Sequence, residues 1–342
     1  MSNKDVNVFF TMGPSQPRTE IWGPAARDLA EELGFNVRMN DHQGPMPIEK
    51  WAEALEGVEA LITCWGAPRL DEKALARNDT LKIVGHAAGS VSGIVSEELY
   101  RRGILVLTAN EIMAGAVAQW CLMTTLLGWH RFTDYAGIGK HRDMKWQDRL
   151  LTRGLQDAVI SVWGYGDISS RLIRFLQPFG PKEILVCSGH LTPEQAAEAG
   201  VTLVSFDEMF ERGDIIHTLG ALTERNKGRV GAEQLAKIKD NALLINAGRA
   251  HLIQEEPFLA ELRKGRFQAI LDVHYAEPLP DDSPLRGLPN VTVTPHCAGR
   301  GRDGLYAVHV LKEFDRFFRG EPLTSQVPLE RARMMTGKAP LR

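Results

Sequence analysis

The sequence predicts an α/β protein whose open, doubly wound parallel sheets form two domains. Short apolar runs alternate with segments of helical spacing along nearly the whole chain, as in parallel sheets covered by helices. One such run, Ala158–Trp163, ends in a glycine turn that leads into a helix. The chain of 342 residues is also long enough to bury two separate cores.

The first hundred residues or so predict a smaller α/β domain. Its expected strands are 6–10, 35–39, 60–63, 81–84 and 104–107. Its expected helices are 24–34, which ends on a glycine, 48–55 and 71–76. Strands that alternate with helices in this way favour an open sheet in a small domain.

A long helix is expected from about Asn110 to Phe132, with Thr108 or Asn110 as its N-cap. Within it, residues 112–129 are almost free of charge and nearly long enough to span a bilayer. Gln119, two threonines and two glycines interrupt this segment, and no second segment of this kind exists. It therefore indicates a helix buried between domains or subunits.

The alternation resumes at Ala158 and predicts a second domain. Its expected strands are 158–163, 184–187, 215–219, 242–245, 269–272 and 291–293. Its expected helices start at Ser170 and continue at 192–199, 206–211, 231–238 and 257–264. A last helix, 303–318, follows this domain, and we expect it to pack back on the first domain.

The turn from Gly164 to Ser169 is typical of a dinucleotide site. Gly164 allows the tight turn, and Gly166 lets a phosphate approach the backbone at the start of the helix. The expected contacts are Gly164, Gly166, Asp167 and Ile168. Ser169 stands where a third glycine is usual, but its side chain is small enough for helix–strand packing.

Three more stretches follow predicted strands of the second domain, at 245–249, 272–278 and 294–299. They place Arg249, Glu277 and His296 at one edge of the sheet, where ligands of open α/β folds bind. Each alone has an ordinary interpretation, as a surface ion-pair arginine, a loop glutamate or a turn histidine. Further histidines lie near strand ends and compete for the same role: His86, His251 and His274.

In combination, the three groups suit hydride transfer at a secondary alcohol. An arginine binds a carboxylate or polarises a carbonyl, and a histidine oriented by a carboxylate exchanges a proton near neutral pH. A dinucleotide beside them would take or give the hydride.

These stretches, GYGDIS, NAGRA, DVHYAEPLP-DDSPL and NVTVTPHCAG, resemble the D-isomer-specific 2-hydroxyacid dehydrogenases. The resemblance implies a Rossmann-type dinucleotide-binding domain, 110–299, and a smaller flavodoxin-like substrate domain, 1–109 with 300–342. It implies that His296 is the acid/base, that Glu277 orients it and that Arg249 binds the 2-oxo acid.

The resemblance also implies the remaining contacts of the site. Ala247 and Asp272 would bind the coenzyme, with Asp272 at the carboxamide. Gly89 and Ser90 would hold the substrate carboxylate through their amides. A homodimer formed largely through the dinucleotide domain is expected.

The end of the second strand of this domain departs from the usual pattern. An acidic residue about 20 positions after the glycines normally binds the adenosine ribose and selects NAD. Here that place is taken by Ser188, and no arginine follows it in the sequence. Either NAD or NADP therefore fits, and the missing carboxylate predicts that NADP(H) is accepted and slightly favoured.

Bulk properties limit the remaining classes. A net charge of −3 gives no reason to expect nucleic acid or an anionic membrane, and we expect no metal because the four cysteines have no metal-ligand spacing. They indicate reduced thiols and a cytoplasmic protein. Formate dehydrogenase, disfavoured by Glu277, and a nicotinamide-nucleotide-sensing protein of the corepressor type are the alternatives. The side chains do not identify the 2-hydroxy acid.

Overall fold

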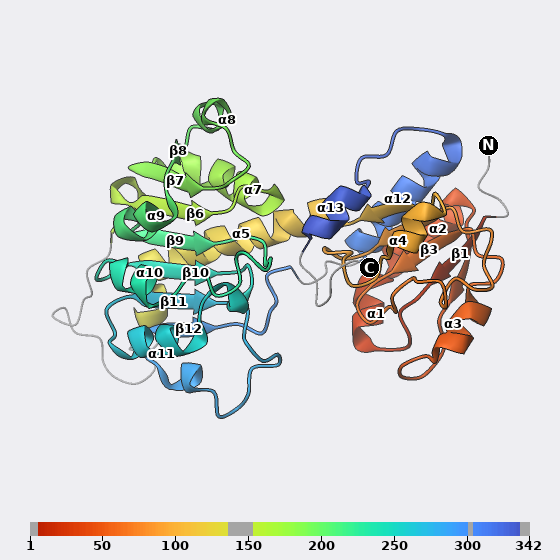
Figure 1. Cartoon of the computed structure of the whole chain (residues 1–342), viewed down its shortest axis with the longest axis horizontal. Helices are drawn as coiled ribbons and strands as arrows, with labels where there is room; N and C mark the ends of the chain where they lie inside the picture. Colours follow the sequence, from red (N-terminus) through yellow and green to blue (C-terminus); the bar gives the residue numbers. More distant parts are fainter. Residues whose placement is uncertain (1–5, 136–152, 300–303, 336–342) are drawn as a thin grey trace. The chain divides into compact units, whose positions relative to one another are not determined.

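The computed structural model describes residues 6–135, 153–299 and 304–335. Its contacts divide the chain into two compact units. The first unit is Met1–Met113 with Arg300–Arg342, and the second is Ala114–Gly299. Each contains one sheet in which all strand pairs are parallel, so the predicted α/β class is confirmed (Figure 1).

The sheet of the first unit has the strand order β2-β1-β3-β4-β5. These strands are β1 (Asn7–Phe10), β2 (Asn36–Met39), β3 (Ala60–Thr63), β4 (Ile83–His86) and β5 (Leu105–Thr108). One face packs against α1 (Gln16–Ile21), α2 (Pro24–Leu33) and α12 (Leu305–Arg319). The other packs against α3 (Ile48–Ala54), α4 (Glu97–Arg101) and α13 (Leu329–Met334).

Helix α12 completes the core of the first unit, as expected. A Cβ atom on Gly85 would lie 2.2 Å from Val310 and 3.0 Å from Phe314, so a glycine is needed where α12 crosses β4. Glu313 lies in α12, and its buried carboxylate accepts hydrogen bonds from the amides and hydroxyls of Thr324 and Ser325, which follow the helix. These bonds hold the C-terminal segment against β5.

The sheet of the second unit has the order β12-β11-β10-β9-β6-β7-β8, which Figure 1 shows as a stack of seven strands. The strands are β6 (Val159–Trp163), β7 (Glu183–Cys187), β8 (Thr202–Leu203), β9 (Ile215–Thr218), β10 (Leu243–Asn246), β11 (Gln268–Leu271) and β12 (Val291–Val293). The helices are α5 (Asn110–Trp129), which begins in the first unit, α7 (Asp167–Leu176), α8 (Pro193–Glu198), α9 (Phe206–Arg212), α10 (Ala232–Lys237) and α11 (Glu255–Arg263). Short 3₁₀ turns lie at η2 (Leu155–Asp157), η3 (Gln177–Phe179), η4 (Ala250–Leu252) and η5 (Pro284–Gly287).

Alternate residues of these strands face different helices. Trp163, Ile216 and Leu244 face the cluster formed by α9, α10 and α11. On the other face, a Cβ atom on Gly128 of α5 would lie 2.7 Å from the side chain of Leu243, so α5 lies close against the sheet. Helix α5 is the one described helix apolar and long enough to cross a membrane, and half of it is buried in the protein. This burial explains its apolar sequence without a bilayer.

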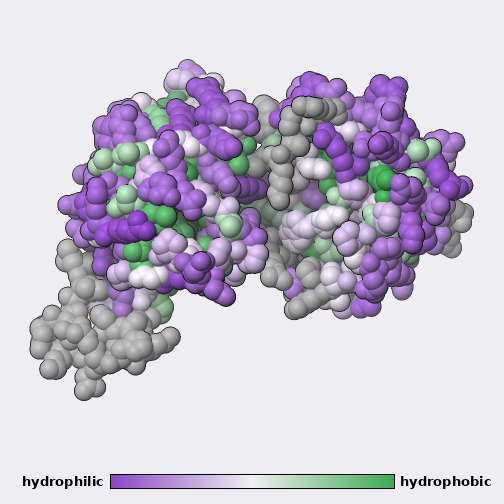
Figure 2. All heavy atoms as spheres, turned by 60° about the horizontal axis from the view of Figure 1, so that its bottom comes forward, coloured by the Kyte–Doolittle hydropathy of each residue, from purple (hydrophilic) through white to green (hydrophobic). Residues whose placement is uncertain are grey.

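The surface is largely hydrophilic, with scattered hydrophobic patches on the face that Figure 2 shows. The most exposed large apolar side chain of the second unit's described residues is Phe132, at 57%, followed by Met123 of α5 at 46%.

Several sequence-based boundaries are wrong. No helix forms at 71–76, where the chain makes hydrogen-bonded turns in which the carboxylate of Asp71 accepts the amides of Lys73 and Ala74. Helix α7 begins at Asp167 rather than Ser170, directly after the glycine turn, and α5 ends at Trp129. The short elements α1, α4, α13 and β8 were not predicted, because two to six residues give too little periodicity.

Candidate active site

The turn after β6 requires its first glycine. Gly164 has a φ of 94°, a left-handed conformation that other residues rarely adopt. A Cβ atom there would lie 3.1 Å from the Cα atom of Gly220 and 3.2 Å from the carbonyl oxygen of Leu219. The amide of Gly164 donates to the carbonyl of Cys187 at 2.9 Å, which ties the turn to the end of β7.

The second glycine leaves room for a ligand. Gly166 is the N-cap of α7, has no side chain to accept the helix's first amides, and has an extended conformation that any residue could adopt. A Cβ atom on it would meet no atom within 4 Å. An open glycine at an uncapped helix N-terminus fits the diphosphate of a dinucleotide. Ser169, in the first turn, is buried at 1% exposure, where only a small side chain fits.

The order of the strands places this turn at the switch point of the sheet. From β6 the chain proceeds to β7 and β8 on one side, and then returns to β9 on the other side of β6. A crevice forms at the carboxyl ends of the strands at such a point. Residues that follow β10, β11 and β12 reach the same edge.

His296 and Glu277, which follow β12 and β11, form the central pair of this edge. Nδ1 of His296 lies 2.9 Å from both carboxylate oxygens of Glu277. Because an ionised carboxylate only accepts hydrogen bonds, Nδ1 carries the proton and Nε2 is left to exchange one with a ligand. The side chains are 43% and 39% exposed, so a ligand can reach them.

Glu277 is held by more than one contact. Burial raises the pKa of its carboxyl, but hydrogen bonds from His296 and from the amide of His274, together with the charges of these histidines, outweigh burial and lower it. The amide of His274 donates to Glu277 at 3.1 Å. His296 itself has a φ of 52°, so the backbone of the turn is constrained where the imidazole is presented.

Arg249 lies between β10 and the 3₁₀ turn η4. Asn246, the last residue of β10, shapes this turn, because its side chain binds the amide of Gly248 and the carbonyl of Arg249. Burial lowers the pKa of Arg249, and the negative charge of Glu277 opposes this effect. A half-buried guanidinium close to the Glu277–His296 pair is suited to bind a carboxylate.

Asp272 has a structural role at this edge. Its carboxylate, 1% exposed, accepts the hydroxyl of Thr294 at 2.5 Å and the amides of Cys297 and Ala298, each at 2.9 Å. The carboxylate therefore fixes the loop on both sides of His296. These bonds could not be predicted from the sequence, since they join residues that follow different strands.

The competing histidines have other surroundings. His86 lies 3.0 Å from the hydroxyl of Thr63, and burial lowers its pKa to about 4. His274 binds the carbonyl of Thr294, and His251 packs edge-on against Tyr275. A fourth, His217 of β9, lies 3.0 Å from the hydroxyl of Thr125, and burial lowers its pKa to about 3. Buried and neutral, His86 and His217 are poor proton donors at neutral pH.

The remaining predicted site residues form three groups. Gly89 and Ser90 belong to the first unit, in the loop after β4, where the hydroxyl of Thr108 binds the carbonyls of Ala88 and Gly89. Ser188 follows β7, and its hydroxyl accepts the amide of His190 at 3.3 Å. Ala247 follows β10 and is 8% exposed.

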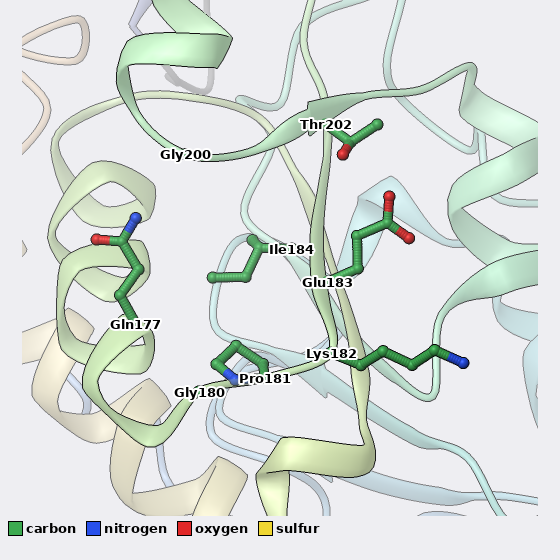
Figure 3. A pocket seen from close by; sticks show the side chains of 8 residues that line it. All are labelled: Gln177, Gly180, Pro181, Lys182, Glu183, Ile184, Gly200 and Thr202. Carbon is green, nitrogen blue, oxygen red and sulfur yellow. The ribbon is translucent and has the colours of Figure 1, made fainter.

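A hollow of about 270 Å³ lies at the opposite edge of the second sheet (Figure 3). It is lined by residues at the amino ends of β7 and β8, including Lys182, Glu183 and Thr202. Because ligands of open α/β sheets bind at the carboxyl ends, this hollow is distinct from the candidate site.

Comparisons with known proteins point to one family. The family model described as "D-isomer specific 2-hydroxyacid dehydrogenase, NAD binding domain" matches residues 123–298, more than half of the chain. A human protein named glyoxylate reductase/hydroxypyruvate reductase is 25% identical over 309 residues, covering 88% of this chain and 93% of that protein.

A second relative, glyoxylate/hydroxypyruvate reductase B of Yersinia enterocolitica, is 28% identical over 301 residues, covering 85% of this chain and 90% of the relative. A solved structure with the same fold is the NAD-complexed D-isomer specific 2-hydroxyacid dehydrogenase of Lactobacillus delbrueckii ssp. bulgaricus. Its TM-score is 0.77 at 19% identity, over 94% of this chain and 100% of that one.

Proposed function

We propose roles for Arg249, Glu277 and His296 on the premise that this chain belongs to the D-isomer-specific 2-hydroxyacid dehydrogenase family. The chain is thus an NAD-dependent oxidoreductase that interconverts a 2-oxo acid and its 2-hydroxy acid. The single observation that supports these roles is the hydrogen bond of His296 to both oxygens of Glu277, beside the glycine turn of a dinucleotide site.

His296 is the proposed acid/base. Its Nδ1 proton is held by Glu277, so the ring has a fixed orientation and its Nε2 atom faces the reacting oxygen. In reduction, Nε2 gives a proton to the carbonyl oxygen, and in oxidation it takes the hydroxyl proton.

Arg249 is the proposed anchor for the substrate. Its planar fork of donors matches a carboxylate and polarises the neighbouring 2-oxo group. We assign the amides of Gly89 and Ser90, on the first unit, to the same carboxylate. A Cβ atom on Gly89 would lie 3.0 Å from the sulfur of Met113, so a glycine suits this position. Because a glycine has no side chain, a ligand can approach its backbone amide closely.

The coenzyme contacts follow the glycine turn. We assign the diphosphate to Gly164, Gly166, Asp167 and Ile168, and the nicotinamide end to Ala247 and Asp272. Asp272 has one role in the fold already, since three hydrogen bonds from the loop of His296 reach its carboxylate. When bound, the nicotinamide supplies or accepts the hydride.

We propose that both NAD(H) and NADP(H) are accepted, with NADP(H) slightly favoured. Ser188 stands where an acid would repel a 2′-phosphate, and its hydroxyl, next to the amide of His190, can donate to such a phosphate. We further propose a cytoplasmic homodimer in which the exposed side of α5 that includes Met123 is covered by the second copy. Sedimentation equilibrium would return the monomer mass if this is wrong.

The substrate class is tested with a panel of acids and both coenzymes. We propose small 2-oxo acids such as glyoxylate and hydroxypyruvate, because relatives over nearly the whole chain carry those names. Loss of absorbance of the reduced nicotinamide is expected with at least one of them. Oxidation of formate instead, or coenzyme binding with no turnover on any acid, would contradict the proposal and favour a formate dehydrogenase or a nucleotide sensor.

A further inference from the structure

A cation from a distant part of the sequence lies at the adenosine end of the candidate site. Arg229 belongs to the segment between β9 and α10, and its guanidinium stacks on the ring of Phe206, 3.9 Å from the ring centre. Phe206 in turn packs edge-on against Trp163, the last residue of β6, with ring centres 4.9 Å apart. Arg229 is therefore fixed near the carboxyl ends of the strands.

The charge of Arg229 reaches the end of β7. Burial raises the pKa of the Cys187 thiol, and the positive charge of Arg229 opposes that rise. Cys187 is the last residue of β7, and Ser188 follows it directly. Since Trp163 is paired with Cys187 across the sheet, the guanidinium lies within electrostatic range of the strand end at which the adenosine ribose of a dinucleotide is bound in this fold class.

The donors of Arg229 are open to a ligand. Within residues 6–135, 153–299 and 304–335, its guanidinium forms no ion pair and no hydrogen bond. The carboxylate that feels its charge, Asp207, is already bound by Gln234 at 3.1 Å and by Lys237 at 3.1 Å. Stacking on Phe206 uses the face of the guanidinium and leaves its N–H edge free to bind an anion.

We propose that Arg229, together with Ser188, binds the 2′-phosphate of NADP(H) and is the residue that determines coenzyme choice in this chain. The inference rests on the proposed NADP(H) preference and names the residue that produces it. The arginine does not follow β7 in the sequence, where such a residue would be sought. It reaches the same place from the segment after β9.

Two other uses of Arg229 make different predictions. If its guanidinium stacks on the adenine ring, it stabilises every adenine nucleotide equally. If it only covers Phe206, its loss lowers the free energy of unfolding and leaves nucleotide selectivity unchanged. A pair of ligands that differ only in the 2′-phosphate distinguishes these possibilities.

The experiment measures binding calorimetrically with adenosine 2′,5′-bisphosphate and with adenosine 5′-monophosphate, in the absence of substrate. The variants are Arg229→Leu, Arg229→Lys and, as the matched control, Arg225→Leu, which removes an exposed arginine from the same segment. In the wild type, the bisphosphate should bind more tightly. Arg229→Leu should lower its affinity about 10- to 100-fold and change that of the monophosphate less than about twofold.

The Lys variant should retain part of the preference, because a point charge still attracts the phosphate. In the wild type, the preference for the bisphosphate over the monophosphate should decrease from pH 8 to pH 5. The 2′-phosphate loses charge over this range, since the second pKa of a phosphate monoester is about 6. Equal losses for both ligands in Arg229→Leu, or no loss for either, would overturn the inference. So would an equal loss of bisphosphate affinity in Arg225→Leu.

Failure of the inference differs from failure of the proposed function. If the wild type shows no preference for the 2′-phosphate but reduces a 2-oxo acid with NADH, the role of Arg229 and the NADP(H) preference are wrong, whereas the proposed reaction holds. If the bisphosphate binds through Arg229 but no 2-oxo acid is reduced with either coenzyme, the role of Arg229 holds and the proposed reaction is wrong.

Discussion

The turn after β1 and the turn after β6 occupy equivalent places in two parallel sheets, since each follows the strand at which the strand order reverses. After β1, the side chain of Ser15 accepts the amide of Arg18 at 3.2 Å, and a proline in the first turn of α1 removes another donor. After β6, Gly166 provides no side chain and α7 starts at once. A few side chains in the turn, rather than the topology, therefore decide which sheet can bind a diphosphate.

The largest effect is expected at the catalytic edge of the second unit. His296→Asn should lower kcat about 10²- to 10⁴-fold, because no other group would exchange the proton, while the coenzyme dissociation constant stays within about twofold. Steady-state kinetics and coenzyme fluorescence titration measure the two quantities. The same substitution at the exposed His190, beside Ser188, is the control and should leave kcat nearly unchanged. A variant of His296 with close to wild-type turnover would remove the imidazole from the proposed mechanism.

The two turns themselves can be separated by single substitutions. Gly166→Ala adds a methyl group in open space, so folding should be intact while coenzyme affinity falls by about tenfold or more. Ser15→Ala in the first unit should lower the free energy of unfolding by about 1 kcal/mol, because the cap of α1 is lost, and should leave coenzyme affinity unchanged. Calorimetric titration and urea unfolding provide the comparison. Equal losses of coenzyme affinity in both variants would show that the turns do not differ as described.

The buried histidines of the two sheets should respond alike to acid. Because burial lowers the pKa of His86 to about 4 and that of His217 to about 3, both stay neutral in the folded chain and take up protons on unfolding below about pH 6.5. Each should therefore reduce the unfolding free energy by about 2 kcal/mol between pH 6.5 and pH 5.

Urea unfolding of the ligand-free protein at several pH values measures this contribution. The stability of His217→Gln, relative to the wild type, should improve by about 2 kcal/mol from pH 6.5 to pH 5. Parallel curves for the variant and the wild type over this range would contradict the assignment.

Much of the second unit could be predicted because five of its seven strands are largely apolar runs of four or five residues bounded by turns. The approach of residues 249, 277 and 296 to one edge followed from parallel strands alone, and the structure adds the hydrogen bond between Glu277 and His296. The catalytic roles of these residues stay predictions. The bonds of Asp272 and the stacking of Arg229 on Phe206 could not be predicted, because they join segments that meet only in the folded sheet.

Some boundaries differ between the sequence analysis and the structure. The segment 71–76 has the composition of a helix and begins with a side-chain cap from Asp71, but its backbone hydrogen bonds form successive turns that do not continue as a helix. Helix α7 starts at Asp167, three residues before the predicted start at Ser170, because the apolar residues that mark the helix in the sequence, Leu172, Ile173 and Leu176, begin only in its second turn. The sequence boundary between the domains was set at 109/110, whereas the contacts divide the chain at 113/114, inside α5.

The packing of α12 against β4 has a consequence for synthesis on the ribosome. The face formed by Val8, Phe10 and Ile62 is covered in part by α12, which is made only after the whole second unit. At 5–20 residues per second, the roughly 190 residues between them take about 10 to 40 s. During that time the second unit can fold, whereas the sheet of the first unit has an apolar face that α12 does not yet cover. The nascent first unit is therefore the part of the chain to which we expect a chaperone to bind, because its apolar face is exposed.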